Sequence, residues 1–161
     1  MTKEKKLDQT GGKMQVEAIR RGTVIDHIPP GQGLKIVNRL QLLDNRVRLT
    51  VGFNLSSKAQ SYKDIIKVDD WLFSETEANE LALFAPDSTV NIIEDYKVVS
   101  KFKMSTPEEL KGVFPCPNSN CISHSEPVDS RFYVKLRGDG LQLKCHYCEK
   151  LFNKELFTEA H

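Results

Sequence analysis

All four cysteines of this 161-residue chain lie in its last third, in two closely spaced pairs. Cys116 and Cys121 are separated by four residues, Cys145 and Cys148 by two, and 23 residues lie between the pairs. Each pair can occupy a tight turn, so that four thiolates converge tetrahedrally on one Zn²⁺ ion. Four thiolates leave no open coordination position for water, so the predicted site is structural and not catalytic.

Two alternatives to a metal site remain open at this point: a redox-active CxxC pair and a chance clustering of cysteines. Residues 131–145, between the pairs, have the pattern of a β-hairpin that turns near Gly138 and returns the second pair to the first. His124 and His146 lie near the cysteines, but four thiolates already fill a tetrahedron, so both are expected on the surface. A module of about 50 residues buries little core, so metal binding would supply its folding free energy.

Charge and targeting signals place the chain among ordinary soluble proteins. Lys and Arg number 23 against 22 Asp and Glu, a formal charge of +1, which marks neither a nucleic-acid binder nor a membrane-surface binder. No apolar region follows the N-terminal lysines, and no stretch approaches the roughly 18 apolar residues of a membrane span. A cytoplasmic location is therefore expected, and its reducing conditions favour metal over disulfides. Residues 1–14, with Gly11-Gly12, are interpreted as a flexible tail.

The residues before the cysteine module predict a β-α-β-β-α-β order with one extra strand. This is the arrangement of a ferredoxin-like α+β domain, in which two helices cover one face of the sheet. The second helix should begin at a capping box, Ser74 with Glu77, and stop before Pro86. We expect this domain over residues 15–104 and a small, zinc-bound antiparallel β domain over residues 105–161. The expected strands cover residues 15–28, 46–55, 65–68, 88–94 and 96–103, with a bend of the first strand at Arg21-Gly22 as an alternative. The expected helices cover residues 33–43 and 74–85.

One expected strand has the clearest alternation in the chain. It places Val47, Leu49, Val51, Phe53 and Leu55 on one face, with polar residues on the other. Residues 104–112, with a proline and mixed charge, are interpreted as a linker or a short helix.

Longer blocks of sequence resemble a known family. VEAIRRGTVIDHIP, KDIIKV, TVNIIEDYKVVSK and CPNSNCIS followed by CHYCE, in this order, are similar to the regulatory chain of bacterial aspartate carbamoyltransferase. The resemblance runs from Gln15 to about Phe152. It implies a non-catalytic subunit whose first domain binds CTP, ATP or UTP and pairs into a homodimer. Its zinc domain, with one Zn²⁺ per chain, would dock on catalytic chains, in a dodecamer of six catalytic and six regulatory chains.

The same resemblance implies a set of nucleotide contacts. A triphosphate needs cations, and a base needs backbone donors and an apolar slot. Each residue also has an ordinary alternative, as a sheet-core residue or a solvated charge. Phe102-Lys103 follow Lys101 where a small residue and arginine are common in the family, which leaves the phosphate contacts and the effector preference open. The implied contacts are Glu17, Ala18 and Ile19 at the base, Asp26 and His27 near ribose and phosphate, Lys67 near ribose and base, Lys101 at the phosphates, and Asn91, Ile93, Tyr96 and Val98.

Two other classes of function have less support. A nucleic-acid-binding protein would need a basic stripe with interleaved aromatics or an RNP-like strand, and neither pattern is present. An enzyme would need a catalytic set or a phosphate-cradling GxxxxGK loop, and neither can be located. We therefore expect no nucleic-acid partner, no membrane partner and no catalytic activity. The sign and size of the response to each nucleotide do not follow from the sequence.

Overall fold

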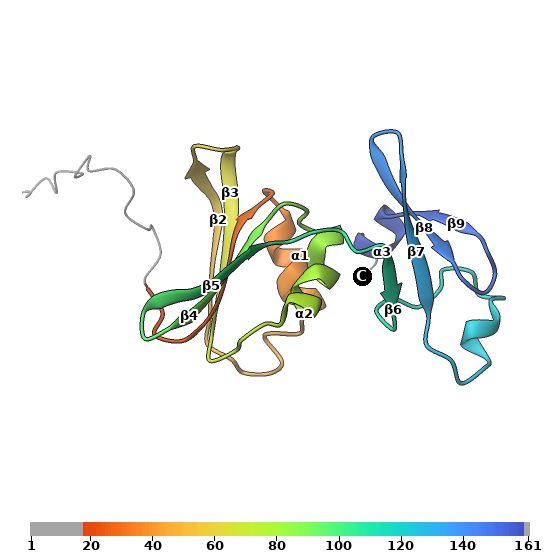
Figure 1. Cartoon of the computed structure of the whole chain (residues 1–161), viewed down its shortest axis with the longest axis horizontal. Helices are drawn as coiled ribbons and strands as arrows, with labels where there is room; N and C mark the ends of the chain where they lie inside the picture. Colours follow the sequence, from red (N-terminus) through yellow and green to blue (C-terminus); the bar gives the residue numbers. More distant parts are fainter. Residues whose placement is uncertain (1–17, 160–161) are drawn as a thin grey trace, which may run out of the picture.

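The computed structural model describes residues 18–159, and the predicted tail and Glu17 lie outside this range. A five-stranded sheet in the order β2-β3-β1-β4-β5 forms the larger domain, here called the sheet domain, and neighbouring strands are antiparallel (Figure 1). This is the ferredoxin-like order with one strand added at an edge, as predicted. The strands are β1 (Gly22–Ile28), β2 (Leu49–Ser57), β3 (Ser61–Asp69), β4 (Thr89–Glu94) and β5 (Lys97–Lys103).

Two helices lie on one face of this sheet, as predicted: α1 (Gln32–Arg39) and α2 (Glu75–Glu80), which the 3₁₀ turn η1 (Leu81–Leu83) continues. The predicted capping box is present, because the Ser74 hydroxyl accepts the Glu77 N–H and the Glu77 carboxylate accepts the Ser74 N–H. The first helix ends at Arg39, earlier than the predicted Leu43. Its apolar spacing continues, but Gln41 adopts a left-handed φ of 50°, which an α-helix does not accommodate.

The two faces of the sheet have different roles. Ile25, Ile66, Val68 and Val90 are buried in the main core against the helices. Val24, Ile65 and Ile93, on the same three strands, form a separate small cluster. Because successive side chains of a strand point to opposite faces, this second cluster belongs to the face away from α1 and α2.

The first strand is shorter than predicted. Within the described residues it begins at Gly22, and Ala18–Arg21 are not part of it. A Cβ at Gly22 would lie 2.0 Å from the Val68 carbonyl oxygen, and its φ of 144° favours glycine, so the chain bends here. The Arg20 carbonyl instead accepts the N–H of Tyr96, at 3.0 Å, which ties this segment to the β4–β5 turn.

The predicted single apolar face of β2 is also wrong in its second half. Its pairing with β3 shifts between Gly52 and Leu55, and Asn54 has a φ of 52°, so a bulge interrupts the alternation. Before the bulge, Leu49 and Val51 pack on the helix side, whereas Leu55 packs on the opposite cluster. Phe53 is left 48% exposed.

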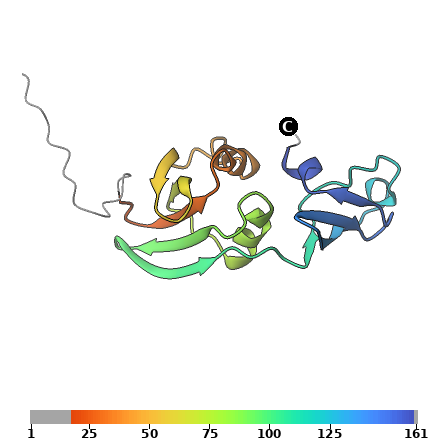
Figure 2. The same cartoon turned by 90° about the horizontal axis from the view of Figure 1, so that it is seen from above.

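A second, smaller part follows, here called the cysteine domain, and its four-stranded antiparallel sheet confirms the predicted small β domain (Figure 2). The predicted hairpin is present as β7 and β8, and its turn contains Gly138. The segment predicted as a linker or a helix instead contains a short strand, because Leu110 pairs with Phe132 of β7. The elements are β6 (Glu109–Lys111), the 3₁₀ turn η2 (Ile122–His124), β7 (Arg131–Arg137), β8 (Gly140–Cys145), β9 (Leu151–Asn153) and α3 (Glu155–Thr158).

The apolar cores of the two domains are continuous. Phe114 of the cysteine domain is 6% exposed and packs on Phe84, just after η1, with ring centroids 6.3 Å apart. It also packs on Phe157 of α3, at 5.4 Å. Aromatic contacts of this kind bury large area in fixed geometry, so the cysteine domain lies against the helical layer of the sheet domain. No helix within the described residues has the length and apolar character of a membrane span.

Candidate functional site

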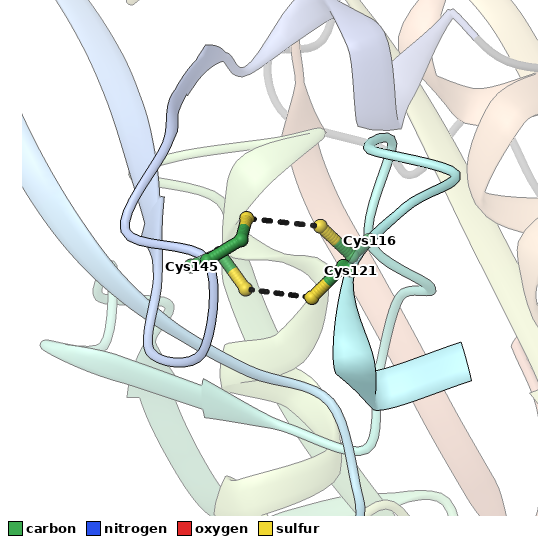
Figure 3. Close-up of side chains that lie close together, drawn as sticks. Cys116, Cys121 and Cys145 are labelled. Carbon is green, nitrogen blue, oxygen red and sulfur yellow. Dashed lines mark hydrogen bonds between the residues drawn. The ribbon is translucent and has the colours of Figure 1, made fainter. Parts of the chain in front are cut away.

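The four cysteines converge at one point of the cysteine domain. Their sulfur atoms all lie within 4.8 Å of one another, and those of Cys116 and Cys148 are 3.8 Å apart. The sulfur atoms of Cys121 and Cys145 are 3.7 Å apart (Figure 3). A Zn–S distance of about 2.3 Å places the sulfurs of a tetrahedral site about 3.8 Å apart. A disulfide would need about 2.05 Å. The thiols are free, and their spacing fits a tetrahedral metal centre.

The thiol environments are already biased toward holding negative charge at two of the four positions. Burial raises the pKa of Cys121, but hydrogen bonds from Ser123 and contacts with Cys145 and Cys116 outweigh it and lower this pKa to about 6. The Ser123 hydroxyl donates to the Cys121 sulfur at 3.1 Å. Burial likewise raises the pKa of Cys148, but a hydrogen bond from the Lys150 backbone helps to bring it below its usual value.

At the other two positions burial is the dominant cause, and it raises the pKa values of Cys116 and Cys145. Buried thiols of this kind become thiolates when a cation compensates the loss of hydration. The four cysteines are therefore better explained as ligands of one divalent metal ion than as four independent thiols. The arrangement is closed, with three cysteines buried and Cys148 half-buried, which is typical of a structural site.

The nearby histidines contribute no metal ligand in this arrangement, since the clustered donors of the described residues are the cysteines alone. Both histidines are exposed, as predicted. His124 Nε2 lies 2.9 Å from the Cys116 carbonyl oxygen and 3.1 Å from that of Asn118, so it braces the first cysteine turn. His146 Nδ1 lies 2.9 Å from the Tyr133 hydroxyl.

A cavity of about 260 Å³ opens on the face of the sheet away from α1 and α2. It gathers every described residue of the predicted nucleotide set; Glu17 lies outside the described residues. The lining comes from β1, β3, β4, β5 and the segment before β1, so strands distant in sequence contribute to one surface. The predicted residues in its wall are Ala18, Ile19, Asp26, His27, Lys67, Asn91, Ile93, Tyr96, Val98 and Lys101.

The wall combines an apolar slot with charged groups. Lys67 is only 1% exposed, whereas Lys101 is exposed and has no ion-pair partner among the residues that the structure describes. Asp26 forms an ion pair with Lys63, with Nζ and Oδ1 2.7 Å apart and both side chains largely buried. Asp26 Oδ1 also accepts the His27 N–H at 2.7 Å, and a left-handed φ of 57° turns His27 toward the cavity.

Three further lining residues were absent from the predicted set: Val24, Ile65 and Thr89. Each lies two positions from a predicted residue on the same strand, namely Asp26, Lys67 and Asn91. Strand alternation alone could have identified them, because residues i and i+2 share a face. Val24 and Ile65 look like ordinary core residues in the sequence, which concealed their place in the wall.

The fold and the cysteine cluster define a class of protein: a ferredoxin-like α+β domain joined to a small metal-binding β domain. Comparison with known families gives the same division. Residues 14–105 match the allosteric domain of the aspartate carbamoyltransferase regulatory chain, and residues 108–158 match the metal-binding domain of that chain.

Individual relatives align with this chain over most of their length. The chain is 59% identical to the aspartate carbamoyltransferase regulatory chain of Tolumonas auensis over 148 residues, 92% of this chain and 96% of the relative. It is 54% identical to that of Aeromonas hydrophila over 149 residues, 92% of this chain and 97% of the relative. With the regulatory chain of Photobacterium profundum it shares 49% identity over 161 residues, the full length of both.

This chain belongs to the family of aspartate carbamoyltransferase regulatory chains. The resemblance identified in the sequence is thereby confirmed. Membership also confirms that the chain is a regulatory, non-catalytic subunit with an allosteric domain and a metal-binding domain.

Proposed function

We propose that this chain senses nucleoside triphosphates for a cytoplasmic aspartate carbamoyltransferase. CTP, ATP and UTP bind in the cavity of the sheet domain, over residues 15–104, and one Zn²⁺ binds the four cysteines of the domain over residues 105–161. The observation that carries the proposal is the joint lining of one cavity by Lys67, Lys101, Asn91 and an apolar slot. A nucleotide needs these three elements together: cations for phosphate, a polar group for orientation and an apolar surface for the base.

The chemistry of the wall divides the cavity between the parts of a nucleotide. Lys101, the exposed cation of edge strand β5, is suited to a triphosphate, which remains partly in solvent. Ile19, Ile93 and Val98 supply apolar contact for the base, and the backbone of Ala18 supplies donors and acceptors. Asp26 and His27, beside Lys63, are suited to ribose and phosphate.

Zn²⁺ in the cysteine cluster would serve as a structural cross-link. Bound there, the metal would connect the segment before η2, with Cys116 and Cys121, to the end of β8 and the turn after it, with Cys145 and Cys148. The cysteine domain also presents apolar side chains to solvent, with Leu136 81% and Ile122 53% exposed. Exposed apolar groups on a small, metal-stabilised domain support a docking role, and we assign the catalytic chains as the partner.

Assembly follows the composition of the family: the sheet domains pair as a homodimer, and six regulatory and six catalytic chains form a dodecamer. Among the strands of residues 18–159, β2 has a neighbour on one side only, and its Phe53 is exposed, which supports pairing with a second copy. Converging reduced thiols support a reducing, cytoplasmic location.

Co-expression with a catalytic chain tests this function. The purified complex should contain both chains, and its activity at subsaturating aspartate should change on addition of CTP, ATP or UTP. The isolated regulatory chain should have no carbamoyl-transfer activity but should bind nucleotide by calorimetry. A chain that binds none of the three nucleotides, or that does not co-purify with the catalytic chain, would contradict the proposal. A gel-shift assay with DNA and RNA at moderate salt tests the rival class, a nucleic-acid-binding protein, and should show no binding.

A further inference from the structure

Helix α1 is attached at its beginning to a strand of the cavity. The Asp64 carboxylate, 0% exposed, accepts the N–H of Gly31 at 3.0 Å and of Gly33 at 3.1 Å through Oδ2. Its other oxygen accepts the Asn54 N–H at 3.0 Å, at the bulge of β2. A Cβ at Gly33 would lie 3.0 Å from Asp64 Oδ2, so the helix start sits directly against this carboxylate.

Asp64 and the cavity are connected through alternate residues of β3. Ile65 and Lys67 line the cavity, and Lys63 is ion-paired with the cavity residue Asp26. Asp64 lies between Lys63 and Ile65 and points to the opposite face, toward α1. A displacement of β3 by a ligand at the cavity therefore displaces the hydrogen-bond acceptor of the helix start.

Two side chains of α1 attach it to the cysteine domain: Lys35 in the middle of the helix and Arg39 at its end. Lys35 Nζ lies 2.5 Å from Glu159 Oε1, after α3. Arg39, the last helical residue, donates a hydrogen bond to the Val113 carbonyl oxygen, and its guanidinium carbon lies 4.9 Å from the centroid of the Phe114 ring. Phe114 in turn packs on Phe157.

The views of Figures 1 and 2 place α1 in the helical layer that faces the cysteine domain. The contacts of α1 with the cysteine domain are a hydrogen bond and a cation–π contact from Arg39 and an ion pair from Lys35. A planar guanidinium can donate to a carbonyl and stack on a ring at the same time, whereas an ammonium group cannot do both in this geometry.

We propose that α1 is the mechanical link between the cavity and the cysteine domain, and that Arg39 is the positioning residue at its output end. The inference rests on the proposed function, because the cavity must bind an effector for the link to carry a signal. Asp64 contacts the start of α1 and is the input of the link, and Arg39 and Lys35, the two α1 residues that contact the cysteine domain, are its output. Weakening the output end should leave nucleotide affinity of the free chain unchanged and reduce the response of the assembled enzyme.

The test uses the complete complex with catalytic chains, reconstituted with Arg39→Gln or Arg39→Lys. Arg46→Gln is the matched control, since Arg46 is exposed in the turn after α1 and, within the described residues, contacts no group of the cysteine domain by a hydrogen bond, an ion pair or a ring. Three quantities are measured: CTP and ATP affinity of the free chain, zinc content, and the shift in half-saturating aspartate caused by each nucleotide. In Arg39→Gln that shift should fall below about half of the wild-type shift, with affinity within about 2-fold of wild type.

Arg39→Lys should also have a reduced shift, because charge alone does not restore stacking on Phe114. Arg46→Gln should respond like wild type. An Arg39→Gln complex with a wild-type shift would overturn the inference. If that variant assembles poorly, the ion pair gives a second test: Lys35→Glu should reduce the shift, and Lys35→Glu with Glu159→Lys should restore it, whereas an unchanged shift in Lys35→Glu would count against the link.

The outcomes separate the two proposals. If no nucleotide shifts the half-saturating aspartate concentration of the wild-type complex, the proposed function is wrong. If the wild-type complex shows the shift and the Arg39 and Lys35 variants show an equal shift, only the role of α1 and Arg39 is wrong.

Discussion

The sulfur atoms of Cys121 and Cys145 lie 3.7 Å apart, although 23 residues separate them in the sequence. This distance is too long for a disulfide and close to that between two ligands of one tetrahedral zinc ion. The β7–β8 hairpin accounts for part of this approach, because it pairs Phe132 of β7 with Cys145 at the end of β8. Residues 122–130, which include η2, then place Cys121 beside Cys145. A hairpin and the segment before it thus bring together two halves of a metal site.

Zinc content is the first prediction. The wild-type chain should bind one Zn²⁺, and Cys148→Ser should bind much less, because a serine hydroxyl is a poor replacement for a thiolate ligand. Metal analysis after dialysis measures this, with Ser125→Ala as a control, since Ser125 is exposed and its hydroxyl donates to the Ile122 carbonyl oxygen and not to a cysteine. Equal zinc in the wild type and in Cys148→Ser would contradict the site.

The second prediction concerns Lys101. A charge-assisted contact to phosphate is worth about 1.5 to 3 kcal/mol, so Lys101→Ala should weaken CTP and ATP binding by about 10-fold to 150-fold. Calorimetry measures the affinities. Lys97→Ala is a matched control, since Lys97 is exposed on the same strand but does not line the cavity. Unchanged affinity in Lys101→Ala would remove this residue from the site.

Local sequence patterns were sufficient for most elements of the fold. The capping box at Ser74 and the β7–β8 hairpin depend on interactions within a few residues, and both are present as predicted. The failures depend on contacts that are distant in sequence. At Gly22, where β1 begins, the Val68 carbonyl of another strand leaves no room for a side chain. The β2 bulge at Asn54 is stabilised by Asp64, ten residues away on β3.

The cysteine cluster and the cavity also differ in how far the sequence alone predicts them. Spacing alone predicted that Cys116, Cys121, Cys145 and Cys148 meet, because short turns and one hairpin determine their positions. The cavity brings together five segments of the chain, and only the family resemblance identified its residues in advance. The contact of Arg39 with Phe114 had no signal in the sequence, because 75 positions separate two residues that look like a surface cation and a core aromatic.

The third prediction is the stability of Asp64→Asn. An asparagine keeps one acceptor oxygen but presents an NH₂ donor in place of the other, so at least one of three backbone N–H groups loses its partner. Leaving a buried donor unpaired costs about 1 to 3 kcal/mol, and the free energy of unfolding from urea denaturation should fall by that amount. Asp87→Asn is the control, since its ion pair with Lys103 is exposed and a surface pair contributes about 0 to 1 kcal/mol. Equal stability of the two variants would contradict the buried role of Asp64.

The last prediction concerns removal of the metal from the full chain. Without Zn²⁺ the cysteine domain should unfold, because no cation then compensates the thiolate charge at Cys121 and Cys148, the metal cross-link is lost, and the core around Phe132 and Leu143 is small. The sheet domain has its own helices and sheet, so a chelator-treated chain should still bind CTP by calorimetry but should not assemble with catalytic chains. When the cysteine domain unfolds, Phe114 no longer covers Phe84, so the Phe84 ring becomes exposed. The melting temperature of the sheet domain should therefore fall. Addition of Zn²⁺ should restore assembly.

Full assembly and normal regulation of metal-free chains would contradict the docking role of the cysteine domain. Loss of nucleotide binding together with zinc would instead mean that the continuous core makes the two domains one folding unit.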